Sequence, residues 1–231
     1  FCVPNELWQK PPMRVLNVNS TLGLKKGGGT AERTFQMSRH LALLGMPTTV
    51  LTLDLELDLQ RQKDVAPATV IALQALWERF YIPRVNWKII REAVDNADVV
   101  HLMGHWGVVN ALVYLAVRRA KKPYVVCPAG ALPLFGRSFV LKWLYNLFIG
   151  KALIRNAAAW IAVTEAEFQQ FQAYGVPSTK IRVIPNGVNK EDFPLTERQV
   201  FLQRHAIPDA PYILFMGRLN QIKGPDLLLD A

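Results

Sequence analysis

Three consecutive glycines are the first residues in this sequence whose type and spacing suggest chemistry. Gly27, Gly28 and Gly29 lie in the segment LGLKKGGGTAE. Consecutive glycines let backbone amides approach an anion at the start of a helix, so the segment fits a phosphate or sugar site; it equally fits a flexible turn. A P-loop is excluded because Gly29 stands where lysine is required, and the G-x-G-x-x-G pattern is absent. ATPases and dinucleotide oxidoreductases are therefore disfavoured.

Two histidines, His101 and His105, lie in the segment HLMGHWGVVNA. A histidine at this point can hydrogen-bond a substrate hydroxyl or accept a proton near neutral pH. Neither has a cysteine or carboxylate neighbour at the spacing of a zinc site. We predict a catalytic role for both, and the alternative is that each is a structural side chain.

Two cations, Arg218 and Lys223, lie near the C-terminus in GRLNQIKG, beside Gly217 and Gly224. Fixed cations next to glycines suit a diphosphate, whose negative charge increases when a sugar–phosphate bond breaks. The alternative is a pair of solvated surface charges.

The carboxylates Asp54, Glu56 and Asp58 alternate in a way that suggests a metal-binding D-x-D arrangement. Such a run is more often the solvated face of a strand or loop. We therefore expect no metal ion and no resident cofactor.

Six apolar segments are predicted to form the strands that position these residues. A helix is expected over Thr30–Leu44, and a helical pattern runs through Leu73, Leu76, Trp77 and Phe80. Alternation of buried strands with helices predicts an α/β fold, a Rossmann-like doubly wound parallel sheet that binds ligands at the carboxyl ends of its strands. The predicted strands are 14–19, 48–53, 98–102, 124–127, 160–164 and 182–184.

The composition is that of a folded protein, with 51% hydrophobic and 19% charged residues. Cys2 and Cys127 have no disulfide or metal spacing, and the most apolar stretch, 138–163, is interrupted by charges, so a cytoplasmic protein without a membrane span is expected. The net charge of +9 favours nucleic acid, an anionic membrane or phosphorylated ligands. No nucleic-acid motif is present. The segment FVLKWLYNLFIGKALIRNAAAW fits either a bilayer surface or a core-facing helix.

Taken in order, these motifs resemble the retaining glycosyltransferases of family 4, which have the GT-B fold. The resemblance covers about residues 14–231 and depends on the succession GGGTAER, DVVHLMGHW, PYVVCPAGAL, WIAVTEAE, IRVIPNGVN and ILFMGRLNQIKG. The order of these segments is more specific than any one of them.

The resemblance implies two Rossmann-like domains facing a cleft, with no metal needed. It implies a GT-B N-terminal acceptor-side domain at 13–189 and a linker at 190–211, while residues 1–12 form a leader outside the family match. Residues 212–231 would be the first strand, 212–216, and the helix start of a truncated C-terminal donor-binding domain. Gly28 and Gly29 would lie near the donor diphosphate, and Arg218 and Lys223 would bind its phosphates.

Two departures from the family pattern limit what is carried over. The family's P-H-G motif is matched here by Pro128, Ala129 and Gly130, so its histidine role has no counterpart. The E-x7-E region would lie beyond Ala231. His101 and His105 are left to place the acceptor.

The function expected is therefore transfer of a sugar, with retention, from a nucleotide-sugar donor to a saccharide or lipid-linked acceptor, in cell-surface polysaccharide synthesis. We expect the chain alone to be inactive. The alternative is a non-catalytic Rossmann-like fragment that binds the acceptor or the inner face of an anionic membrane.

Overall fold

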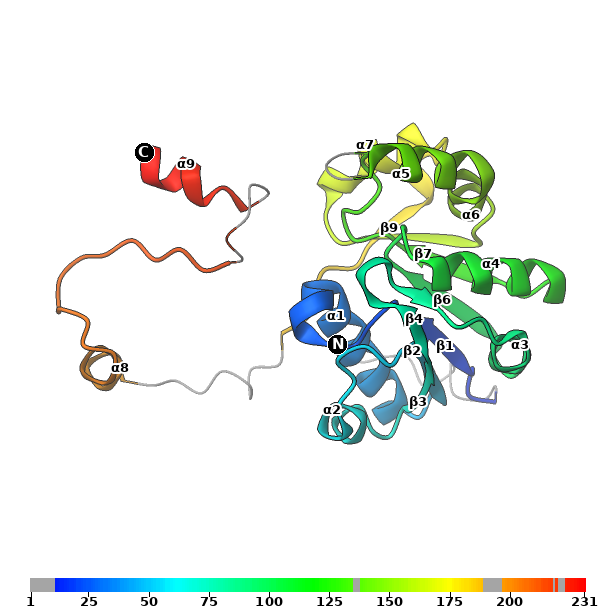
Figure 1. Cartoon of the computed structure of the whole chain (residues 1–231), viewed down its shortest axis with the longest axis horizontal. Helices are drawn as coiled ribbons and strands as arrows, with labels where there is room; N and C mark the ends of the chain where they lie inside the picture. Colours follow the sequence, from blue (N-terminus) through cyan, green and yellow to red (C-terminus); the bar gives the residue numbers. More distant parts are fainter. Residues whose placement is uncertain (1–10, 135–137, 189–196, 218, 220–222) are drawn as a thin grey trace. The chain divides into compact units, whose positions relative to one another are not determined.

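The computed structural model describes residues 11–134, 138–188, 197–217, 219 and 223–231 (Figure 1). The chain divides into two compact units, unit 1 at Phe1–Gly187 and unit 2 at Val188–Ala231. Each unit is described separately below.

Unit 1 is built on a seven-stranded parallel sheet with the order β3-β2-β1-β6-β7-β8-β9. The chain adds β2 and β3 on one side of β1 and then crosses to place β6 on the other side. The predicted α/β, Rossmann-like doubly wound fold is thus confirmed, as are the six predicted strands. The sheet strands are β1 Val15–Val18, β2 Thr48–Leu53, β3 Thr69–Leu73, β6 Val99–Met103, β7 Tyr124–Cys127, β8 Ala159–Ala162 and β9 Ile181–Val183.

Helices cover both faces of the sheet in unit 1. Figure 1 shows α1 and α2 on one face and α3 and α4 on the other. The α-helices are α1 Leu24–Leu43, α2 Leu59–Asp64, α3 Trp87–Asp95, α4 Val108–Ala120, α5 Phe139–Tyr145, α6 Lys151–Arg155 and α7 Phe168–Ala173; a π-helical turn, η3 Asn146–Gly150, joins α5 to α6, and 3-10 turns occur at η2 Glu78–Phe80, η4 Glu165–Glu167 and η5 Ser178–Lys180.

The core lies between the sheet and these helices. Leu16, Val18 and Leu102 are completely buried on adjacent strands. Strands that are covered on both faces have few positions open to polar side chains, which is why β1, β2, β6 and β7 were recognisable as short apolar runs.

The helical pattern expected through Leu73, Leu76, Trp77 and Phe80 is wrong. Leu73 ends strand β3, and residues 75–83 form an antiparallel pair, β4 Ala75–Trp77 with β5 Ile82–Pro83. Leu73 is buried, whereas Leu76 and Trp77 are 72% and 56% exposed, so no common face is buried. The edge of β2 offers the segment Thr69–Leu73 a hydrogen-bonding partner, and this tertiary contact overrides the local periodicity.

Unit 2 contains the short helices α8 Arg198–Arg204 and α9 Pro225–Asp230. The strand expected over 212–216 is absent from this part of the described chain, and that prediction is wrong. A parallel strand needs a hydrogen-bonded neighbour, and none of the described residues of unit 2 pairs with this segment. Among the residues that the structure describes, no helix is both long and apolar enough to cross a bilayer.

Candidate functional site

The sheet has one point at which the strand order reverses, between β1 and β6. In open α/β sheets the helices diverge there, and ligands bind in the crevice outside the carboxyl ends of the two strands. The segment after β1 contains the three glycines, and the segment after β6 contains His105. Two of the motifs singled out from the sequence therefore flank this switch point.

The glycine segment contains a break in helix α1. Gly28 has φ 55° and ψ −140°, a conformation that is essentially restricted to glycine. A new helical segment therefore begins at Gly29, where an added Cβ would meet no atom within 4 Å. The first amides of a helix have no intrahelical acceptor, so this start can bind an anion. That Gly28 and Gly29 bind the donor stays a prediction.

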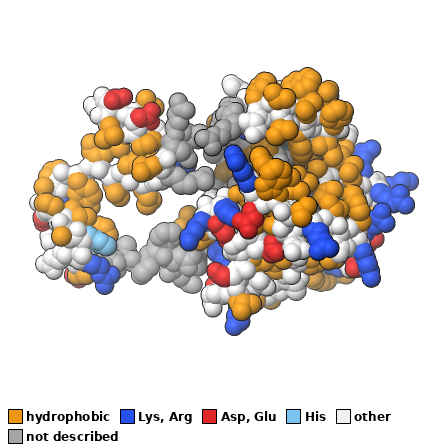
Figure 2. Space-filling model, viewed as in Figure 1, with side chains coloured by type: hydrophobic (Ala, Val, Ile, Leu, Met, Phe, Trp, Pro, Cys, Tyr) orange, Lys and Arg blue, Asp and Glu red, His pale blue; other side chains and the backbone are white. Residues whose placement is uncertain are grey.

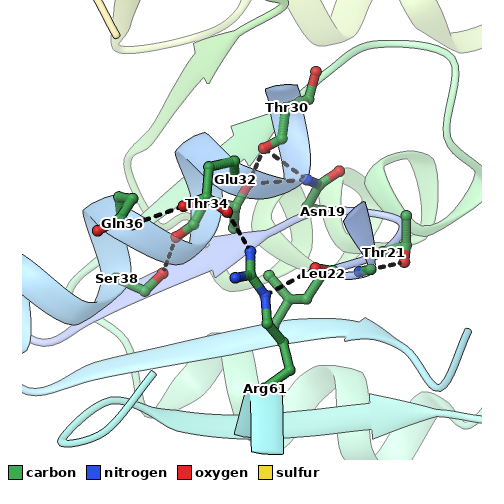
Figure 3. A network of polar contacts seen from close by, with 10 residues as sticks. Asn19, Thr21, Leu22, Thr30, Glu32, Thr34, Gln36, Ser38 and Arg61 are labelled. Atoms are coloured by element: carbon green, nitrogen blue, oxygen red, sulfur yellow. Dashed lines mark hydrogen bonds and ion pairs between the residues drawn. The ribbon is translucent and has the colours of Figure 1, made fainter. Parts of the chain in front are cut away.

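A polar network holds the glycine segment on both sides (Figure 3). On the C-terminal side, Asn19 Nδ2 donates to the Thr30 carbonyl oxygen at 3.2 Å and to Thr34 Oγ1 at 2.9 Å. On the N-terminal side, Arg61 Nε donates to the Leu22 carbonyl oxygen at 3.3 Å. Arg61 Nη2 also pairs with Glu32 Oε2 at 2.6 Å. The helix start is thus fixed before any ligand arrives, which lowers the entropic cost of binding.

His101 is buried within the sheet, with 5% of its surface exposed. Its Nδ1 lies 3.2 Å from Asn17 Oδ1, which can only accept, so Nδ1 carries the proton and Nε2 the lone pair. Burial, reinforced by the charge of Arg33, lowers the pKa of His101 to about 4. The ring is neutral at physiological pH, and Nε2 has no hydrogen-bond partner among the described residues.

His105 lies in an aromatic pocket and is 2% exposed. Its ring makes edge contacts with Trp106, Tyr145 and Tyr174. Nε2 donates to Asn146 Oδ1 at 3.0 Å, and burial outweighs this contact and lowers the pKa to about 4. Within the described chain Nδ1 is unpaired. A role for either histidine in placing an acceptor stays a prediction.

Arg33, which our sequence analysis did not single out, is a buried cation at the same edge of the sheet. It lies on α1 and is 6% exposed. Its charge influences the pKa of His101, of Cys127 at the end of β7 and of Glu167 after β8. The sequence offered no signal for this burial, because Arg33 lies about 100° or more around the helix from the buried Ala31, Thr34 and Ser38.

Each of the carboxylates considered for metal binding accepts a hydrogen bond from a backbone amide. Asp54 Oδ1 accepts from the Ala75 amide at 2.8 Å, and Glu56 Oε2 accepts from the Lys26 amide at 2.9 Å. Asp58 caps the start of α2. In the described ranges no group of three or more metal-binding side chains is present.

Of the two cations predicted to bind the donor, the structure describes one. Lys223 is exposed in unit 2, just before α9, and Arg218 lies outside the described residues. Ala129, at the family's histidine position, has a left-handed backbone with φ 50° and is followed by Gly130 with φ 76°.

The model of the glycosyl transferase 4-like domain matches residues 28–187 of this chain. The D-inositol 3-phosphate glycosyltransferase of Acidothermus cellulolyticus is 26% identical over 230 residues, with 90% of this chain and 50% of the relative aligned. The enzyme of the same name from Nocardiopsis dassonvillei is 38% identical over 81 residues, covering 34% of this chain and 19% of the relative. The chain thus spans about half the length of the first of these curated relatives.

Solved structures share the fold at low sequence identity. HepE of Anabaena, in complex with UDP and glucose, superimposes with a TM-score of 0.67 at 17% identity, covering 94% of this chain and 57% of HepE. A glycosyltransferase from Rickettsia africae superimposes with a TM-score of 0.58 at 21% identity, covering 87% and 51% of the two chains.

Proposed function

Because the chain belongs to the glycosyl transferase 4-like family, we propose that it forms one half of an enzyme that transfers a sugar from a nucleotide-sugar donor to a saccharide or lipid-linked acceptor. The observation that carries this proposal is the helix start at Gly29, which lies beside the switch point of the sheet and is open to an anion. We further propose that transfer retains the anomeric configuration and serves cell-surface polysaccharide synthesis.

The donor diphosphate is proposed to be bound by backbone amides and fixed cations rather than by a metal ion. The amides are those at Gly28 and Gly29, and the cations are Arg218 and Lys223. Both kinds of group stabilise the charge that develops on a departing nucleoside diphosphate. His101 and His105, neutral at physiological pH, are proposed to position the acceptor through hydrogen bonds.

A direct test is product formation from a panel of uridine and guanosine diphosphate sugars. It compares the 231-residue chain with a protein that continues it to the length of its relatives. The longer protein should turn over at least one donor, and Arg218→Ala or Lys223→Ala should lower kcat by roughly 100-fold, about the effect of one lost charge-stabilising group. The shorter chain should have little or no activity.

One result would contradict sugar transfer, and another would contradict the proposal that this chain is only half of the enzyme. A folded longer protein that is silent with every donor would remove the case for sugar transfer. Robust turnover by the 231-residue chain would show that the residues beyond it are not needed. Retention is read separately, from the anomeric configuration of the product by NMR.

A second candidate function is attachment to an anionic membrane, and it is favoured by an exposed apolar surface on unit 1. We name this surface the α5 face. Figure 2 shows hydrophobic side chains gathered at the upper end of unit 1, where Figure 1 places α5. An apolar cluster of this kind on a protein surface marks an interaction site. Its members are Phe139, Val140, Leu141, Trp143, Leu147 and Phe148, of which Phe148 is 79% exposed.

The charge of the sequence interval that contains the α5 face favours an anionic lipid surface as its partner. Between Asp98 and Glu165 the sequence contains no acidic residue but eight basic ones. Aromatic and aliphatic side chains that enter the headgroup region, supported by basic side chains around them, are the usual basis of peripheral membrane binding. The basic residues are Arg118, Arg119, Lys121, Lys122, Arg137, Lys142, Lys151 and Arg155.

Vesicle co-sedimentation tests this attachment. The chain should bind vesicles that contain phosphatidylglycerol, bind pure phosphatidylcholine weakly, and dissociate as salt rises and shortens the screening length. The double variant Leu147→Asp/Phe148→Asp should lose binding. The control Leu59→Asp/Leu76→Asp alters side chains of similar exposure on other elements and should retain it. If the chain instead dimerises and Leu147→Asp/Phe148→Asp dissociates the dimer, a second copy covers the α5 face and the membrane proposal is wrong.

A further inference from the structure

Arg33 is a buried cation that makes no ion pair with any residue that the structure describes. Only 6% of its surface is exposed. Removing a guanidinium from water without a carboxylate at salt-bridge distance is costly, and such a group is retained in a fold when other polar groups compensate it. The groups that Arg33 contacts therefore indicate what the residue does.

The guanidinium bonds to the segment that ends unit 1. Arg33 Nη1 donates to the Pro185 carbonyl oxygen at 3.1 Å and to Asn186 Oδ1 at 2.8 Å. Both acceptors lie beyond β9, more than 150 residues away in sequence and immediately before the boundary at Gly187. Hydrogen bonds to a charged donor are the stronger kind.

These contacts are the main constraint on an otherwise exposed segment. The sheet's last bond here runs from the Ile184 amide to the Ala162 carbonyl oxygen at 2.9 Å. Pro185, Asn186 and Gly187 are all exposed. Within the described chain, the bonds to Arg33 are the only hydrogen bonds that the structure gives residues 185–187.

The other end of the connection is rigid. Arg33 projects from α1 four residues after Gly29, about one helical turn, and that helix is fixed by the network around Asn19 and Arg61. Its remaining nitrogens, Nε and Nη2, have no hydrogen-bond partner in the described part of the chain. The direction of the chain leaving unit 1 is thus tied to the helix that begins at the glycine break.

We propose that Arg33 is a positioning residue that fixes the path of residues 185–187, and hence the direction in which the chain leaves unit 1. If the proposed function holds, the donor binds at Gly29 on α1. One turn later on the same helix, Arg33 holds the segment that leads towards the proposed donor-binding cations. The attachment itself does not depend on sugar transfer, and its test needs no donor.

The test is the order of the Asn186 and Gly187 amides, measured by ¹⁵N relaxation on the 231-residue chain. In the wild type the order parameters should be near 0.85, the value of rigid backbone. Asn186→Ala removes an acceptor from an exposed residue without disturbing the core, and should lower them to below about 0.6. Arg33→Met should do the same, while Asn186→Asp, which keeps an acceptor for Arg33, should preserve the rigid values.

The matched control is Arg39→Met, on the same helix; Arg39 makes no hydrogen bond or ion pair within the described ranges, and this variant should leave residues 186–187 rigid. A merely structural role for Arg33 would loosen the strands of the sheet as well, whereas a positioning role loosens only the segment after β9. If Arg33→Met fails to fold, the order parameters of Asn186→Ala alone test the proposal. Order parameters that are already low in the wild type, or that stay high in Asn186→Ala, would overturn the proposal.

Discussion

Acidification is expected to destabilise unit 1, because its two buried histidines must take up protons as the chain unfolds. Burial lowers the pKa of His101 and His105 to about 4, from an ordinary value of 6.5. Between these values the unfolded chain binds protons that the folded chain does not. The stabilisation is therefore complete above pH 6.5 and is lost as the pH falls towards 4.

The magnitude follows from the size of the pKa shifts. Each pKa unit corresponds to about 1.4 kcal/mol, so each histidine contributes about 3 kcal/mol between these limits. Two protons taken up together give a slope of about 2.7 kcal/mol per pH unit near pH 5. Glu167 opposes this, because burial raises the pKa of its carboxyl group and acidification then favours the folded form. The histidine effect remains comparable to the whole stability of an ordinary domain, about 5–15 kcal/mol.

Urea unfolding followed by tryptophan fluorescence measures this slope. All six tryptophans lie within residues 1–187, so the signal reports on unit 1. His101→Gln should halve the slope between about pH 6.5 and about pH 4.5, since one proton remains to be bound. His40→Gln alters an exposed histidine and should leave it unchanged. A flat wild-type profile, or an unchanged slope in His101→Gln, would refute the reasoning.

Four further substitutions test the local geometry, each by its urea midpoint. Gly28→Ala should cost roughly 1–3 kcal/mol, because alanine avoids φ 55°, ψ −140°, whereas Gly29→Ala should be tolerated. Equal stability of these two variants would contradict the helix break. Gly150→Ala should cost roughly 1–3 kcal/mol, since its Cβ would lie 2.3 Å from Asn146 Oδ1. Asn146→Ala should cost a similar amount, roughly 1–3 kcal/mol, by leaving the His105 Nε2 proton without an acceptor; no loss there would argue that water replaces the amide.

The parts of the fold that could be predicted are those in which burial and periodicity agree. Strands such as β1 and β7 are covered on both faces, so nearly every residue is apolar and the segment is recognisable alone. Strand β3 was missed because it lies at the edge of the sheet. Its Thr69 and Ala72 are exposed, and the apolar residues that follow happen to recur at helical spacing.

The candidate site, like the fold, could be predicted only in part from the sequence. The glycine segment was recognisable because only glycine tolerates the backbone found at Gly28. The burial of His101 could not be recognised from the sequence, because it depends on β1 and on Arg33, which are distant in sequence. Arg33 itself was missed because a charged residue on a helix is normally solvated. Among the described residues, its hydrogen-bond acceptors are in the segment 185–187, which is distant in sequence.

The π-helical turn at Asn146–Gly150 has a consequence for alignments of related sequences. The Lys151 amide reaches back five residues to the Asn146 carbonyl, so this turn accommodates one residue more than an α-helix does. Deleting that residue would rotate the preceding side chains by about 100° relative to α6, removing Asn146 from between His105 and Tyr174. The same deletion would carry Trp143 away from its outward position. A single-residue gap at this turn should therefore separate relatives that keep both the histidine pocket and the apolar surface from relatives that have lost both.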